Sequence, residues 1–308
     1  MVKLENEIQL KNIINEQIIN EKTVKHGISV RALRIDLIHP IISGNKYFKL
    51  KYYLQDAITR RSEGLLSFGG AWSNHIVAVA YAAAVLRIKS IGVIRGEEST
   101  NLSQTLLDAK AYGMDLKFIS REEYSKKNDE NWIENLKQRY PHHYFVSEGG
   151  YGPLGASGAA DILELLNSKE YSHICCACGT GTMLAGIINS MNQQQQAVGI
   201  SVLKGSTNQL ELDIKRLLQP SSSSKKFDIH DRFHFGGYAK YNQSLFDYMN
   251  NFYRRHQIPT DFVYTGKLFY ATEQLIDDGF FEANSNILII HSGGLQGNLS
   301  LKRGTLIF

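Results

Sequence analysis

Two lysines near residue 46 have the spacing of an anion-binding site. Lys46 and Lys49 follow Ser43, Gly44 and Asn45, and a spacing of three places both side chains on one face of a helix's first turn, with Asn45 the expected N-cap. Two cations there repel each other and oppose the helix dipole, which local stability does not favour. Solvated lysines are the plain alternative, whereas a bound anion would remove the conflict.

Two glycine-containing junctions supply groups that suit an anion. Residues 69–75 precede an alanine-rich helix, so Ser73, Asn74 and the free N–H groups of its first turn either bind a carboxylate or cap the helix. A second loop opens another helix after an apolar strand and presents its N–H groups to one phosphate. Its residues are Gly179, Thr180, Gly181, Thr182 and Met183.

The glycine spacing of this second loop matches neither a Walker loop nor a dinucleotide fingerprint. It therefore favours a mononucleotide or a phosphorylated cofactor, and a glycine-rich turn without ligand stays the alternative. Tyr264 and Ser292 belong to two further motifs, residues 264–267 and 291–294, each expected at the carboxyl end of a strand. Ligands of open α/β sheets collect at that edge, although neither motif is specific alone.

The three cysteines lie together in a span of four residues, inside an apolar run. Cys175, Cys176 and Cys178 are too close together for the long-range disulfides of a secreted framework. A zinc site would need a second cluster of ligands, which the pattern does not offer. We expect a reduced protein in which these residues form a buried strand, and no metal site.

Short β-branched or aromatic runs alternate with helical patterns and predict the elements that position these residues. Several runs are apolar throughout, which is typical of parallel strands covered on both faces by helices, and so the sequence predicts an α/β protein. Between the first two runs, Leu50, Leu54, Ala57 and Ile58 form one helical stripe, and residues 219–226 look like a solvated loop. The expected strands lie at 28–35, 65–68, 91–96, 115–120, 144–150, 173–179, 198–203, 261–266 and 286–294.

Composition and charge exclude several classes of protein. The chain has 308 residues, of which 43% are hydrophobic and 21% charged, as in globular proteins of one large or two ordinary domains. No run approaches about 18 apolar residues, and the first residues lack the apolar region of a secretory signal. The net charge of +4 comes without a basic tail. We therefore expect a cytoplasmic protein that binds neither membrane nor nucleic acid, whereas small anionic ligands suit it.

Taken in order, six motifs resemble the 1-aminocyclopropane-1-carboxylate deaminase and D-cysteine desulfhydrase family. They are SGNKYFKL, FGGAWSNH, EGGYGPLGASG (148–158), CGTGTMLAG, VYTGK and HSGG, and the resemblance runs from about residue 28 to the C-terminus. It implies pyridoxal 5'-phosphate as cofactor and the tryptophan-synthase β-subunit fold, with two three-layer α/β domains and mostly parallel sheets. A large domain of residues 1–49 and 158–308 would carry a small inserted domain, 50–157. A homodimer is expected from the resemblance only.

The resemblance also implies a role for each cofactor residue. Lys46 would bind the cofactor aldehyde covalently, and Lys49 would approach its phosphate. Asn74 would hydrogen-bond the 3'-oxygen of the ring, and the backbone of residues 179–183 would supply the main phosphate contacts. Ser292 is the residue expected near the ring nitrogen.

Three further residues would serve the substrate. Ser73 and the neighbouring amides would bind its carboxylate. Tyr264 would lie against the cofactor ring, and Tyr238, in GGYAKYN, corresponds to a second active-site tyrosine.

The chain departs from the family pattern at four positions. Phe48 stands where an arginine is usual, and His75 where glutamine is common. Strict deaminases carry glutamate and a non-hydroxyl residue where this chain has Thr265 and Ser292, as in the desulfhydrase-like branch. A hydroxyl beside the ring nitrogen gives a weaker electron sink than a carboxylate, and eliminating a good leaving group needs the strong sink less than ring opening does.

We therefore predict a pyridoxal-phosphate lyase that acts on a small amino acid. The expected reaction is β-elimination from D-cysteine to pyruvate, ammonia and sulfide, and the alternative is ring opening of 1-aminocyclopropane-1-carboxylate. A cofactor-binding protein without turnover is a third hypothesis. The presence of Lys46, Ser73, Asn74 and Tyr264 argues against it, because binding alone would not require all four. The physiological substrate and its stereochemistry stay open.

Overall fold

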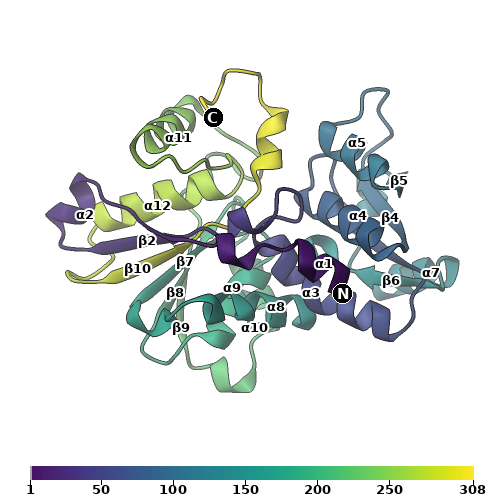
Figure 1. The fold of residues 1–308 in the computed structure, drawn as a ribbon, viewed down its shortest axis with the longest axis horizontal. Coiled ribbons are helices and arrows are strands. Elements are labelled where there is room, and N and C mark those ends of the chain that lie inside the picture. The colour runs from purple at the N-terminus through teal and green to yellow at the C-terminus, as the bar shows by residue number, and fades with distance from the viewer. Residues whose placement is uncertain (1) are drawn as a thin grey trace.

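The computed structural model describes residues 2–308 and contains two separate β-sheets (Figure 1). The larger sheet has six strands in the order β1-β2-β10-β7-β8-β9, and the smaller has four in the order β5-β4-β3-β6. Neighbouring strands are parallel except β1 and β2. The strands are β1 (Asn15–Gln17), β2 (Ser29–Leu33), β3 (Gly64–Gly69), β4 (Lys89–Arg95), β5 (Met114–Ile119), β6 (His143–Val146), β7 (His173–Cys178), β8 (Gln196–Ser201), β9 (Lys226–His230) and β10 (Asn286–Ile290).

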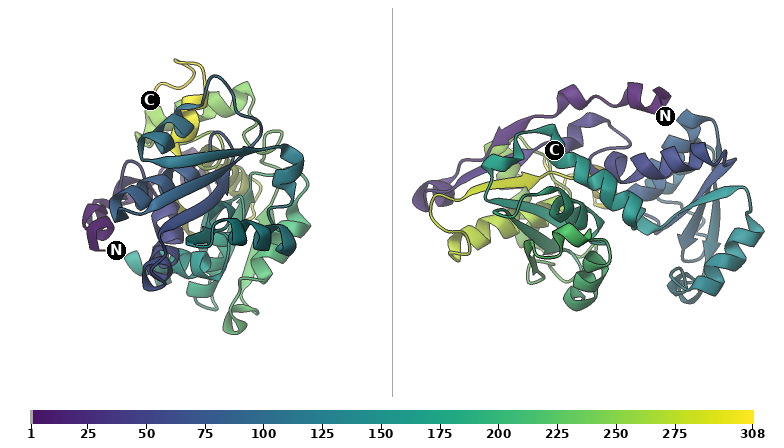
Figure 2. Two further views of the ribbon diagram at one scale, coloured as in Figure 1. Left: turned by 90° about the vertical axis from the view of Figure 1, so that its right-hand side faces the viewer. Right: turned by 90° about the horizontal axis from the view of Figure 1, so that it is seen from below.

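Helices surround both sheets, which occupy separate halves of the molecule (Figures 1 and 2). Central strands such as β3 and β7 are buried along almost their whole length, since helices cover both faces. The helices are α1 (Val2–Glu7), α2 (Glu21–Lys25), α3 (Asn45–Thr59), α4 (Asn74–Leu86), α5 (Gln104–Ala111), α6 (Arg121–Ser125), α7 (Glu130–Arg139), α8 (Pro153–Ala160), α9 (Thr182–Ser190), α10 (Thr207–Lys215), α11 (Gln243–His256) and α12 (Thr265–Asp277).

The α/β class with mostly parallel sheets is confirmed, and eight of the expected strands correspond to observed ones. The strand expected at 261–266 is wrong, because these residues form a turn that leads into α12. Ile58 is also wrong as a member of the buried stripe, since its side chain is 41% exposed beyond the buried Leu54 and Ala57. The edge strands β1 and β9 were not expected: both are short or polar, so neither shows an apolar run. The domain boundaries stay a prediction.

The cysteines lie where the sequence predicts a strand. Cys175, Cys176 and Cys178 are free and fully buried in β7. Within residues 2–308, no three His, Cys, Asp or Glu side chains come together as a metal site. In the same part of the chain, every helix is too short or too polar to span a bilayer.

Helix α8 lies against both α3 and α9 and brings their backbones very close to its own. A Cβ atom on Gly158 would stand 1.8 Å from the carbonyl oxygen of Phe48, in α3. On the other side, a Cβ on Gly186 of α9 would stand 2.5 Å from the carbonyl oxygen of Ala156. These helices therefore approach at backbone distance, which fixes the beginnings of α3 and α9 relative to each other.

We expect Gly158→Ala to destabilise the protein, because the new methyl group collides with a backbone carbonyl that only a shift of α3 can relieve. Overpacking of this kind costs about 1–3 kcal/mol of unfolding free energy. Ser157→Ala is the matched control: Ser157 is exposed in the same helix, so its change should stay within about 0.5 kcal/mol. Denaturant unfolding of both variants measures the difference, and equal stabilities would show that α8 and α3 can separate freely.

Candidate active site

The residues singled out from the sequence gather where β7 and β10 end and α3, α4, α9 and α12 begin. The start of α3 lies directly against the motif that follows β10: the amide of Asn45 donates to the carbonyl of Ser292 at 3.2 Å. Gly44 makes this approach feasible, since its φ is 58° and a Cβ there would stand 2.1 Å from the Ser292 oxygen. Gly44, and not Asn45 as predicted, is the N-cap of α3.

Asn45 instead holds the lysine that follows it. The ammonium of Lys46 donates to Asn45 Oδ1 at 2.8 Å and lies 6.0 Å from the centre of the Tyr264 ring. Burial lowers the pKa of Lys46 to about 7, with a further lowering by Lys49 and an opposing effect of Asp261. A substantial share of Lys46 is therefore a neutral amine near neutral pH, able to take up a proton or attack an aldehyde.

Lys49 is a buried cation without a protein partner. Its side chain is 7% exposed, burial lowers its pKa to about 8, and it forms no ion pair or hydrogen bond within residues 2–308. Gly149 and Gly150 pack beside it: Cβ atoms there would stand 3.1 Å from Thr180 Cγ2 and 3.2 Å from Lys49 Cβ respectively. Lys49 and the loop after β7 therefore flank the same pair of glycines.

The loop after β7 has the free donors that its sequence predicts. Gly181 is the N-cap of α9 with a φ of 77°, and no side chain caps this helix. The amides of residues 179–184 make no hydrogen bond to the described part of the chain, and the first bonded amide is that of Ala185, to the Gly181 carbonyl at 2.9 Å. Unpaired amides at a helix start beside an unpaired ammonium form an anion site of the size of a phosphate.

The start of α4 offers a second polar face. Ser73 is the N-cap, and its hydroxyl accepts from the amide of Ile76 at 3.4 Å, so the capping interpretation holds for this side chain. Asn74 donates to the Gly294 carbonyl at 3.3 Å, while its own Oδ1 is buried without a donor. That orphaned oxygen would be satisfied by a hydroxyl of a bound molecule.

His75 lies behind this face as a neutral imidazole. The Ser67 hydroxyl donates to the Val146 carbonyl at 2.7 Å, so its oxygen accepts from His75 Nε2 at 2.8 Å. Burial, with Lys46 and Lys49 nearby, lowers the pKa of His75 to about 3. Its Nδ1 is thus a buried acceptor without a donor.

Asp261 organises the turn that carries Tyr264. One carboxylate oxygen accepts from the amides of Val263 and Tyr264, both at 2.9 Å, and the other from the amide and hydroxyl of Thr265, both at 2.8 Å. The hydroxyl of Thr265 is therefore engaged with Asp261 and is not directed to a ligand. Burial raises the pKa of Asp261, an effect that these hydrogen bonds oppose.

The two predicted tyrosines meet edge to edge. The hydroxyls of Tyr238 and Tyr264 are 3.5 Å apart, and their ring centres are separated by 6.1 Å. Burial raises the pKa of both phenols, so both stay protonated near neutral pH. Tyr264 also lies against the loop after β7, because a Cβ on Gly179 would stand 3.3 Å from its ring.

The structure thus brings together Lys46, Tyr264, Tyr238 and the loop that starts at Gly179, while Asn74 joins them through Gly294. Ser292, which follows β10, is buried beside the start of α3. Its hydroxyl makes no hydrogen bond in the described part of the chain. Sequence reasoning did not single out Asp261, and it included Lys267 in the motif of residues 264–267 without giving it a role. Asp261 lies four residues before the start of α12, where an aspartate is typical of a turn, but the aromatic and β-branched residues after it predict a strand.

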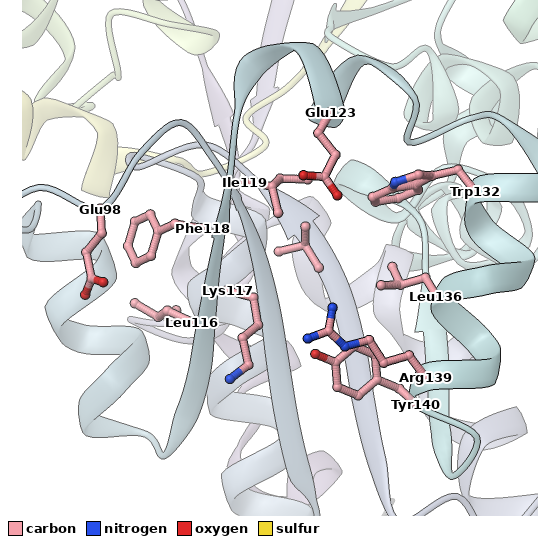
Figure 3. A pocket seen from close by; sticks show the side chains of 11 residues that line it. Glu98, Leu116, Lys117, Phe118, Ile119, Glu123, Trp132, Leu136, Arg139 and Tyr140 are labelled. Carbon is pink, nitrogen blue, oxygen red and sulfur yellow. The ribbon is translucent and has the colours of Figure 1, made fainter.

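A separate hollow lies on the small sheet and contains none of these residues. It measures about 270 Å³ beside β5, where Phe118 and Trp132 are accompanied by the charged Lys117, Glu123 and Arg139 (Figure 3). Its charged side chains include both cations and anions. The convergent donors of the α3 and α9 starts make those helix ends the better candidate site.

The chain matches a known family model and is similar to several curated proteins. The family model described as "Pyridoxal-phosphate dependent enzyme" matches residues 25–293. The chain is 30% identical over 284 residues to a Pyrococcus horikoshii protein named "Putative 1-aminocyclopropane-1-carboxylate deaminase", covering 88% of this chain and 86% of that one. It is 26% identical over 303 residues to the bifunctional D-cysteine desulfhydrase/1-aminocyclopropane-1-carboxylate deaminase of Arabidopsis thaliana mitochondria, covering 88% and 74%.

A solved structure supports the same fold. The crystal structure of an "ACC deaminase homologue" superposes with a TM-score of 0.77 at 27% identity, covering 95% of this chain and 93% of that one. The groups of this site suit pyridoxal phosphate: the unpaired amides of residues 179–184 and the unpaired Lys49 match its phosphate, and the Lys46 amine, which donates to Asn45, matches its aldehyde.

We expect Lys49→Met to weaken binding of pyridoxal phosphate about 10- to 100-fold, because a hydrogen bond to a charged group contributes about 1.5–3 kcal/mol. Binding of pyridoxal, which lacks the phosphate, should change less than twofold. Lys110→Met, at an exposed lysine of α5, is the matched control. Absorbance titration of cofactor-free protein measures each affinity, and an equal loss for both ligands would place Lys49 away from the phosphate.

Proposed function

The chain belongs to the family of pyridoxal-phosphate-dependent enzymes, and on that premise we propose that it is a lyase of the D-cysteine desulfhydrase type. The reaction would convert D-cysteine and water into pyruvate, ammonia and hydrogen sulfide. One observation supports this choice over ring opening: among the described residues, no free carboxylate lies where the nitrogen of the cofactor ring would be. Ser292 offers a hydroxyl there, and both carboxylate oxygens of Asp261 already accept hydrogen bonds.

Cofactor binding would use Lys46 together with groups that have no partner in the described part of the chain. Lys46 would hold the aldehyde, and Lys49 with the amides of residues 179–183 would hold the phosphate. Asn74 would accept from the 3'-hydroxyl through its orphaned Oδ1, and Ser292 would contact the ring nitrogen. When bound, pyridoxal phosphate supplies an electron sink that stabilises negative charge at the substrate α-carbon.

The chain's own groups would then move the protons. Lys46, with a pKa of about 7, would take the proton from the α-carbon as a neutral amine. Ser73 and the first amides of α4 would hold the substrate carboxylate, which is stabilised by the positive end of the helix. Tyr238 and Tyr264, protonated because their pKa values are raised, would supply a proton to the leaving sulfur.

We further propose a cytosolic homodimer with an inserted domain at residues 50–157. The free, buried Cys175, Cys176 and Cys178 suit a reducing compartment. The dimer rests on the family resemblance alone, and the inserted domain on the chain's passage from α3 to the four-stranded sheet and back at α8.

Borohydride reduction of the holoenzyme should attach the pyridoxyl group to Lys46, because its neutral amine is the best nucleophile among the site's lysines. Peptide mass mapping identifies the labelled residue. Lys46→Arg should leave the protein folded but unlabelled, since a guanidinium forms no stable adduct of this kind. A label on Lys49 or Lys267 would exclude the assignment.

Keto-acid release from D-cysteine, L-cysteine, D-serine and 1-aminocyclopropane-1-carboxylate tests the function. We expect D-cysteine to give the highest kcat/KM and Ser292→Leu to lower it about 3- to 10-fold, through loss of a hydrogen bond of about 0.5–1.5 kcal/mol. Ser221→Leu, in an exposed loop, is the control. Ring opening without D-cysteine turnover would reverse the choice in favour of the deaminase. Inactivity toward all four compounds, despite bound cofactor, would favour the non-catalytic hypothesis.

A further inference from the structure

Lys267 is a buried cation for which the proposed chemistry has no use. It lies in the first turn of α12, where the helix dipole disfavours positive charge, and its side chain is 0% exposed. Burial lowers its pKa to about 8. It forms no ion pair in the part of the chain that the structure describes, so its interactions must come from uncharged groups.

Those interactions are two backbone carbonyls of one loop. The ammonium of Lys267 donates to the carbonyl of His234 at 2.8 Å and to that of Gly237 at 2.9 Å. The same carbonyls accept the loop's own amides, from Gly237 at 3.0 Å and from Lys240 at 3.1 Å. Lys267 therefore binds the loop at both of its internal turns.

The loop needs such support because its backbone is strained. Phe235 and Ala239 have φ values of 52° and 53°, in the left-handed region that side chains with a Cβ disfavour. Gly236 and Gly237 between them also have positive φ, at 98° and 120°. Non-glycine residues in this region cost of order 1 kcal/mol each and persist only where their surroundings enforce the conformation.

Tyr238 lies inside this loop, next to Gly237 and Ala239. The residue is 44% exposed, although enough of its phenol is buried to raise the pKa, so packing alone does not fix its position. Its one hydrogen bond in the described chain is to the hydroxyl of Tyr264. The position of the Tyr238 hydroxyl therefore depends on the backbone of residues 234–240.

We infer that Lys267 is a positioning residue for Tyr238: by binding the carbonyls of His234 and Gly237 it holds the Tyr238 hydroxyl beside that of Tyr264. The inference rests on the proposed function, in which the two phenols supply a proton to the leaving group. The start of helix α12 then determines the positions of both phenols, since Tyr264 immediately precedes the helix and Lys267 follows one turn later. The hydroxyls of Tyr238 and Tyr264 would then keep the same relative position whichever substrate is bound.

A double-mutant cycle tests whether Lys267 acts through Tyr238. Lys267→Met keeps an unbranched chain of similar length and removes the donors, and we expect it to lower kcat for D-cysteine at least tenfold with KM changed less than threefold. In a Tyr238→Phe background, the same substitution should cost less than twofold, because the hydroxyl to be positioned is already absent. Lys110→Met, at an exposed lysine of α5 outside this loop, is the control and should leave kcat unchanged.

Hydrogen exchange of the cofactor-free protein gives a readout that does not depend on activity. The amides of Gly237 and Lys240, bonded to the carbonyls that Lys267 holds, should exchange at least tenfold faster in Lys267→Met. Amides of α11 and β10 should exchange as in the wild-type protein. If all four candidate substrates prove inert, the proposed function fails, yet this exchange difference still decides whether Lys267 holds the loop.

Three results would overturn the inference. Equal losses of kcat with and without the Tyr238 hydroxyl would make Lys267 a general stabiliser of the fold. Unchanged exchange at Gly237 and Lys240 would show that the loop keeps its conformation unaided. Should Lys267→Met fail to fold, Lys267→Gln retains a shorter donor and should give an intermediate increase in exchange and loss of kcat; wild-type values for both would reject the role.

Discussion

The ammonium groups of Lys46 and Lys49 stand one helical turn apart at the start of α3, and no carboxylate pairs with either of them in the described chain. The beginnings of α4 and α9 add the positive ends of two more helices to the same region. Asp261 is a nearby negative charge, and both of its carboxylate oxygens already accept hydrogen bonds from the turn before α12. The protein thus concentrates positive charge that an anionic ligand would neutralise. Burial is the main reason why the pKa values of Lys46, Lys49 and His75 are lowered, and neighbouring lysines lower those of Lys46 and His75 further.

Such a region persists because packing elsewhere holds the helices in place. Backbone contacts through Gly158 and Gly186 tie α8 to α3 and α9, and Gly44 lets α3 begin against the loop after β10. Buried polar groups do the same for the turns: Asp261 fixes the one that presents Tyr264, by accepting its amides. The helix starts are therefore pre-organised for the ligand, which spares binding the cost of ordering them.

Much of this arrangement was predictable from the sequence, for identifiable reasons. Buried parallel strands such as β7 are apolar throughout, and the loop beginning at Gly179 has the small residues that an anion requires. The turn at Asp261 was not predictable from local pattern, because Phe262, Val263 and Tyr264 have strand propensity that one buried carboxylate overrides. The contacts of Lys267 were not predictable either, because they join it to carbonyls 30 and 33 residues earlier in the chain, and no local pattern signals such a contact.

The unpaired amides of residues 179–184 do not distinguish a cofactor phosphate from any other small oxyanion. Inorganic phosphate and sulfate would therefore compete with the cofactor for this loop. By mass action, an ion present at one hundred times its dissociation constant would stabilise the fold by about 2.7 kcal/mol and raise the apparent dissociation constant of the cofactor about a hundredfold. The choice of buffer anion would thus change both the apparent thermal stability of the purified protein and the cofactor concentration needed to load it.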